Sequence, residues 1–212
     1  MSDVEASGPL MAYLFADRLL PPRRHSQGTQ VPCSKEYVHT QSLAVFLFSA
    51  AFWSLREQSL IALNVVEDPG SRWHLNHSEV NLKMLERAPR PGLEGAVLEN
   101  LEGESTLCDV VCRWSSKHSN NPWHDVIEEE VTEAVRAGYL RPVSANSGVL
   151  ARLLGAGTEL ESDCSRIAGL EGEFSRWHGS WTDFQEDEAP VYEHLTSACK
   201  KALLTCTECW YP

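Results

Sequence analysis

The longest apolar stretch of this chain runs from Leu43 to Trp53. A helix needs roughly 20 apolar residues to cross a bilayer, and this stretch is about half that length, so we expect it to lie inside the protein. Large apolar side chains go round every face of a helix over residues 41 to 57. Such a helix has no polar face to turn to water, which predicts that it lies at the centre of the core.

A β-hairpin is predicted directly after this helix. Residues 60 to 66 are aliphatic and β-branched, residues 67 to 71 are turn-forming, and residues 72 to 77 can return as the second strand. A helix followed by a hairpin is the ending of a winged helix. Ser78 is then expected to cap a helix that extends to about residue 87.

Most of the remaining chain has helical signals. Short helices are predicted for residues 10 to 20 and 93 to 101, and a third helix begins after Thr106, which with Asp109 forms a capping-box-like start. Residues 21 to 40 have no period and are predicted to be a loop. The clearest helix spans 122 to 137, between the N-cap Asn121 and the terminal Gly138.

The polar side of the 122 to 137 helix is expected to be acidic and solvated. We place Asp125, Glu128, Glu129 and Glu133 on its outer face, and we interpret the triplet Glu128 to Glu130 as mostly solvent-exposed. Residues 139 to 141 then enter a second hairpin. Two units of helix and hairpin in series are therefore expected in a body that spans residues 1 to 157.

Residues 158 to 212 have a different composition and are predicted to form a helical extension packed on that body. Between residues 158 and 198 there are ten acidic residues and two arginines. Four aromatic residues recur here at steps of three and four, which gives an aromatic stripe on one helix: Phe174, Trp177, Trp181 and Phe184. The stripe either packs on the body or binds a protein partner, since aromatic groups in an acidic surround are common anchors.

The stripe hypothesis has a direct consequence. If these rings bind a partner, alanine at Trp177 and Trp181 removes partner capture and leaves thermal melting nearly unchanged. A last helix is expected to begin at Pro190 and to turn Leu195, Cys199 and Cys206 toward the core.

Seven cysteines at scattered spacings favour reduced, mostly buried thiols over a disulfide framework. Cys206 and Cys209 form a CxxC pair, and three interpretations stay open for it: buried thiols, a redox pair, or a metal site completed by distant histidines. Cys108 and Cys112 lie one helical turn apart and could join His118 and His124 around a metal ion. Because core-forming residues surround these thiols, we predict no metal and no cofactor.

Charge excludes several function classes. Thirty acidic residues against eighteen basic ones give a net charge of −12. This charge disfavours nucleic acid as a partner and also disfavours a polybasic membrane anchor, because both need a positive surface. The N-terminal apolar residues 10 to 15 are interrupted by Asp17 and Arg18 and lack the features of a secretory signal. We expect a cytoplasmic protein, with peripheral attachment to a membrane as a second location.

The order of elements resembles the Golgi phosphoprotein 3-like lipid-binding family, which has actinobacterial as well as eukaryotic members. The likeness rests on the helix from Leu43 with the strand that follows it, on the short helix Leu93 to Leu98, and on the stretch from Asn121-Pro122 to Tyr139-Leu140. It implies a largely helical fold and binding of a phosphoinositide headgroup through basic residues of the long helix. Here that helix carries glutamates at positions 128 to 130, which repel anionic headgroups.

These observations predict a mainly α fold with two winged-helix-like units, short β-hairpins and a C-terminal helical extension. The predicted function is non-catalytic: a binding or adaptor protein that recognises a protein partner or a lipid headgroup. Two alternatives stay open, namely a winged-helix transcription regulator and a metal-dependent or other enzyme.

Overall fold

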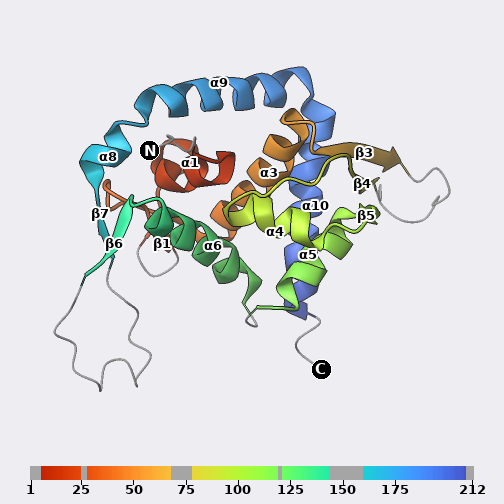
Figure 1. The fold of residues 1–212 in the computed structure, drawn as a ribbon, viewed down its shortest axis with the longest axis horizontal. Coiled ribbons are helices and arrows are strands. Elements are labelled where there is room, and N and C mark those ends of the chain that lie inside the picture. The colour runs from red at the N-terminus through yellow and green to blue at the C-terminus, as the bar shows by residue number, and fades with distance from the viewer. Residues whose placement is uncertain (1–5, 25–27, 68–77, 119–120, 144–159, 209–212) are drawn as a thin grey trace.

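The computed structural model describes residues 6–24, 28–67, 78–118, 121–143 and 160–208 (Figure 1). This part of the chain is mainly helical and carries small antiparallel sheets. Its helices are α1 (Gly8–Leu14), α2 (Ala16–Leu19), α3 (Thr40–Glu57), α4 (Gly92–Asn100), α5 (Leu107–Ser115), α6 (Pro122–Arg136), α8 (Cys164–Ala168), α9 (Glu171–Asp187) and α10 (Ala189–Glu208). Its strands are β1 (Gly28–Gln30), β2 (Tyr37–His39), β3 (Ile61–Glu67), β4 (Ser78–Met84), β5 (Glu104–Thr106), β6 (Leu140–Pro142) and β7 (Leu160–Ser162).

The helix α3 lies at the centre of the core, as its apolar circumference predicts. It contacts α1, α4, α6 and α10, which surround it in Figure 1. Its side chains Leu47, Phe52 and Leu55 are completely buried. Burial of this apolar run removes a large hydrophobic area from water and so stabilises the fold.

The hairpin after α3 is confirmed for the described residues of its two strands. β3 and β4 pair antiparallel from Ile61 opposite Met84 to Glu67 opposite Ser78, and β5 adds to the free edge of β4. The predicted helix from Ser78 is therefore wrong. Val80 and Leu82 are buried and Lys83 is exposed, an alternation of period two that outweighs the capping signal of Ser78. The strand predicted for 72 to 77 lies outside the described residues.

Two short strands lie within residues 21 to 40, where a loop is predicted. β1 and β2 form a short antiparallel pair with Gly28 opposite His39. A Cβ atom on Gly28 would lie 2.8 Å from the carbonyl oxygen of Val38, so the two backbones approach closely because position 28 is glycine. Val38 is completely buried, which anchors the pair on the core.

The long helix α6 is confirmed from Pro122 to Arg136, and Gly138 follows it with φ +79°. The prediction that the acidic side chains of this helix are solvated is wrong in part. Glu130 is completely buried, and Asp125 and Glu133 are 5% and 6% exposed. The reason is that neighbouring elements cover both flanks of α6: it contacts α1, α3, α4 and α10.

The thiol prediction is wrong for one pair of cysteines. Cys33, just after β1, and Cys164, at the start of α8, form a disulfide across 131 positions. Spacing alone could not reveal this pair because the two residues meet only through tertiary structure. Cys199 and Cys206 are buried thiols, as predicted for the last helix.

The C-terminal segment contributes to the same core as the rest of the described chain. In Figure 1, α9 runs along the top over α1 and α3, and α10 turns back along α5. The strand predicted after α6 is confirmed as β6, which pairs with β7, a strand that lies beyond residue 157 in the predicted extension. In the described part of the chain, every helix is too short or too polar to span a membrane.

Candidate functional site

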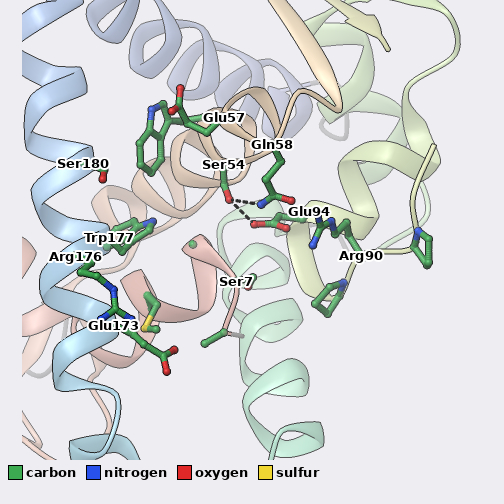
Figure 2. A pocket seen from close by; sticks show the side chains of 16 residues that line it. Ser7, Ser54, Glu57, Gln58, Arg90, Glu94, Glu173, Arg176, Trp177 and Ser180 are labelled. Carbon is green, nitrogen blue, oxygen red and sulfur yellow. Dashed lines mark hydrogen bonds between the residues drawn. The ribbon is translucent and has the colours of Figure 1, made fainter. Parts of the chain in front are cut away.

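A pocket of about 600 Å³ opens between the N-terminus of α1, the C-terminal end of α3, the start of α4 and the middle of α9 (Figure 2). Its volume lies within the roughly 300–1,000 Å³ range of small-molecule sites. Four elements that are far apart in sequence supply its walls. It is therefore a product of tertiary packing and the strongest candidate site in the described residues.

The floor of the pocket is the carboxyl group of Glu94, on α4. This side chain is only 1% exposed. The Ser54 hydroxyl donates a 2.7 Å hydrogen bond to Glu94 Oε1, and Gln58 Nε2 donates a 3.0 Å hydrogen bond to the Ser54 hydroxyl. Figure 2 shows this chain of three side chains running from α3 to α4. Glu94 is thus held in one orientation, facing the pocket.

Burial raises the pKa of Glu94 above its ordinary value because the charged form loses hydration. The Ser54 hydrogen bond, the positive charge of Arg90, the backbone N–H of Gly8 and the Gln58 amide act in the opposite direction. These groups favour the carboxylate but do not cancel the effect of burial. A cation that enters the pocket would shift Glu94 further toward its charged form.

The rim of the pocket carries both signs of charge. Arg90 lies beside Glu94 on one side, and α9 supplies Arg176 and Glu173 on the other side (Figure 2). Both guanidinium-bearing residues are exposed, and Glu173 is half-buried. The site can therefore meet an anionic group at its rim and a cationic group at its floor.

One wall of the pocket is aromatic. The indoles of Trp53 and Trp177 lie edge to face with ring centroids 6.3 Å apart. The Trp177 Nε1 atom is buried and has no hydrogen-bond partner among the described residues. A Cβ atom at Gly8 would lie 2.9 Å from this nitrogen, so the wall approaches the start of α1 closely because position 8 is glycine.

A second buried acid lies on α6, behind the pocket. Glu130 Oε1 accepts a 2.9 Å hydrogen bond from the backbone N–H of Leu93, the residue before Glu94. Burial and the negative charges of Glu94, Glu133 and Glu129 raise the pKa of Glu130 to about 8. Burial also raises the pKa of Tyr13, and Glu130 adds to that effect.

The structure brings the four predicted aromatic residues onto one helix, α9, and packs most of the stripe on the body. Phe174, Trp181 and Phe184 are 4%, 1% and 5% exposed. Phe174 stacks on Phe15 with centroids 4.3 Å apart, and Trp181 lies 5.2 Å from Trp53. Of the four, Trp177 alone lines the pocket. Partner binding by the stripe remains a prediction.

Cys108 and Cys112 lie close together, with 4.0 Å between their Sγ atoms, but the candidate four-ligand metal site is not formed in the described residues. No group of three or more histidine, cysteine, aspartate or glutamate side chains there could hold a metal ion. The His118 Nε2 atom instead lies 3.6 Å from Glu129 Oε1, and both side chains are partly exposed. Cys209 of the CxxC pair lies outside the described residues.

Sequence reasoning missed Glu94, Arg90 and Arg176. One signal could have found Glu94: it falls on the same helical stripe as Val97, Leu98 and Leu101, at i, i+3, i+4 and i+7. An acid on an apolar stripe must be paired or neutralised when it is buried. The two arginines give no such signal because they lie at exposed positions in a loop and on a polar helix face.

Comparisons of this chain with protein families, with curated proteins and with solved structures find no match. The resemblance to the Golgi phosphoprotein 3-like family therefore remains a prediction from the sequence. The geometry of the pocket is the basis for any statement about function.

Proposed function

We propose that this protein is a non-catalytic binding protein whose ligand carries a cationic ammonium group and an anionic group a short distance apart. The observation that carries this proposal is the buried carboxyl of Glu94 at the floor of a pocket whose rim holds two arginines. A zwitterionic lipid headgroup of the phosphocholine type has this chemistry.

The floor and wall of the pocket suit the ammonium group. Glu94 supplies a negative charge in a site shielded from water, where a charge pair is stronger than at the surface. The indoles of Trp53 and Trp177 line the same pocket. Aromatic faces attract quaternary ammonium groups by about 0.5–2 kcal/mol.

The rim suits the anionic group. Arg90 and Arg176 carry guanidinium forks that match the oxygens of phosphate or carboxylate groups. A ligand with only one kind of charge would leave either the acidic floor or the basic rim without a counter-charge, so a zwitterion fits better than a simple cation or anion.

Isothermal titration calorimetry with phosphocholine tests the proposal, with choline alone and inorganic phosphate alone as half-ligands. We expect phosphocholine to bind more tightly than either half. Glu94→Gln should weaken its binding by about 10- to 100-fold, the loss of one charged interaction. Glu99→Gln is the matched control because Glu99 lies exposed on the same helix. Equal affinity of the Glu94→Gln variant and the wild type would contradict the proposal.

Two sources of the ligand can be separated with membranes. Co-sedimentation with phosphatidylcholine vesicles detects a headgroup within a bilayer, and calorimetry detects free phosphocholine. Binding to vesicles that is lost in Glu94→Gln identifies a lipid. Binding of free phosphocholine alone identifies a small metabolite. If the protein binds neither vesicles nor free phosphocholine, the predicted protein partner of the α9 stripe is favoured instead.

The helix and hairpin pairs α3 with β3–β4 and α6 with β6–β7 support an interpretation as two winged-helix-like units. The body of residues 1 to 157 and the extension of 158 to 212 remain our division of the chain. The sequence predicts the cytoplasm or a membrane surface as the location of the protein. The disulfide Cys33–Cys164 argues instead for an oxidising compartment, since such bonds are rare in the cytosol.

A further inference from the structure

The thiols of Cys112 and Cys206 meet at the packed interface between α5 and α10. Their Sγ atoms lie 2.9 Å apart although the residues are 94 positions apart in the chain. Cys108, one turn before Cys112, places its Sγ 4.0 Å from that of Cys112. None of the three belongs to the disulfide Cys33–Cys164.

We propose that Cys112 and Cys206 are a redox-active dithiol that closes to a second disulfide and joins α10 covalently to α5. The oxidant is a small-molecule disulfide of the glutathione class. One thiol loses its proton to water and attacks the oxidant, which releases one reduced thiolate and leaves a mixed disulfide. The other thiol also loses its proton to water, and its thiolate attacks the protein sulfur of that mixed disulfide and releases the second thiolate of the oxidant. Two electrons pass from the pair to the oxidant.

The exposure of the two side chains assigns their order of reaction. Cys112 is half-buried and lines a shallow surface depression together with Arg113 and Ser116. Cys206 is only 3% exposed. Cys112 is therefore the thiol that reaches the oxidant, and Cys206 resolves the mixed disulfide from inside the protein.

The surroundings of the thiols predict a slow reaction. The contact with Cys206 and burial raise the pKa of Cys112, and burial raises the pKa of Cys108 to about 11. Because the thiolate is the reacting species, few of these groups are active at neutral pH. The pair should respond to sustained oxidation and not to brief exposure.

Disulfide mapping tests the proposal. The wild-type protein is equilibrated with glutathione disulfide, its remaining thiols are alkylated, and proteolytic peptides are analysed by mass spectrometry without reductant. We expect a new cross-link between Cys112 and Cys206 and a higher denaturation midpoint. The oxidation of Cys108→Ser and Cys209→Ser variants should give the same cross-link, which excludes the neighbouring cysteines as the true partners.

Stability variants supply a second measurement. Cys112→Ser should abolish the oxidation-dependent rise in the denaturation midpoint and keep the midpoint of the reduced wild type. Cys108→Ser, one turn away on the same helix, should retain the rise. No new cross-link, a cross-link through Cys108 or Cys209, or thiols that react with the alkylating agent only after a chelator is added would each overturn the proposal. The last result would identify a metal site instead.

Discussion

The backbone N–H of Leu93 donates a 2.9 Å hydrogen bond to the carboxyl of Glu130, which ties the first turn of α4 to the middle of α6. The acceptor is a completely buried acid whose second oxygen, Oε2, has no hydrogen-bond partner among the described residues. Burial raises the pKa of Glu130 to about 8, so folding and proton binding are coupled at this position.

The coupling predicts how stability depends on pH. The pKa of Glu130 rises from 4.5 in the unfolded chain to about 8 in the fold, so the folded state holds a proton that the unfolded state releases. The free energy of unfolding is therefore highest below pH 4.5 as far as this group is concerned, and it falls as pH rises toward 8. The Glu130→Gln variant should not show this fall. At alkaline pH its free energy of unfolding should exceed that of the wild type by roughly 2–5 kcal/mol.

Urea denaturation at several pH values between 4.5 and 8 measures this pH dependence of the free energy of unfolding. Glu128→Gln is the matched control, because Glu128 lies exposed on the same helix. Its pH dependence should equal that of the wild type. Burial also raises the pKa of Glu94, so the Glu130→Gln variant keeps a smaller slope of the same sign. An unchanged slope in Glu130→Gln would show that Glu130 is ionised in the fold.

A glycine beside Glu130 gives a second prediction. Gly92 has φ +54°, and a Cβ atom there would lie 2.7 Å from Glu130 Oε1. Gly103 has a similar φ of +63° but nothing within 4 Å of its Cβ position. Alanine at either position must adopt the left-handed backbone conformation, which costs about 1–2 kcal/mol. Gly92→Ala also forces the Glu130 carboxyl away from its hydrogen bond with the Leu93 N–H, so it should destabilise by roughly 1–3 kcal/mol more.

The two variants are compared by chemical denaturation. Because their backbone costs are similar, the difference between them isolates the contact with Glu130. Equal free energies of unfolding for Gly92→Ala and Gly103→Ala would contradict the geometry described for α4 and α6.

The elements that sequence predicted best have strong local signals. The all-round apolar run of α3 and the proline and glycine at the ends of α6 depend on nearby residues alone, and both helices are confirmed. β4 was mistaken for a helix because Ser78 is a good N-cap residue, while the pairing of Val80 opposite Val65 depends on a strand that precedes it by many residues.

The candidate site could not be predicted from the sequence for a related reason. Glu94 accepts a hydrogen bond from Ser54 across 40 positions, and Trp177 lines the same pocket from a distant helix, so no single segment reveals the pocket. The acidic face of α6 was misjudged because helical periodicity shows which residues share a side but not how many neighbours cover the helix. Cys33 and Cys164 likewise meet only once the chain is folded.

The α9 stripe gives a third prediction, which corrects an expectation from the sequence. Trp181 is 1% exposed and contacts Phe46 and Trp53, so Trp181→Ala should destabilise the protein by roughly 3–5 kcal/mol instead of leaving its melting unchanged. Trp177 is half-buried, and its replacement by alanine should cost less stability but weaken phosphocholine binding. Thermal melting and calorimetry of both variants check this division. Equal losses of stability in the two variants would contradict it.

The disulfide gives the last prediction. Cys33 and Cys164 close a loop across 131 positions, and a loop of that length restricts the unfolded chain strongly. The Cys33→Ser/Cys164→Ser double variant should lose about 2–5 kcal/mol of stability. The comparison is made in a Cys112→Ser background, so that the proposed second disulfide contributes to neither protein. A reductant should lower the denaturation midpoint of the Cys112→Ser parent to that of the triple variant and leave the triple variant unchanged. If the reductant has no effect on the parent, the bond from the β1–β2 region to α8 is not formed in solution, and the argument for an oxidising compartment falls with it.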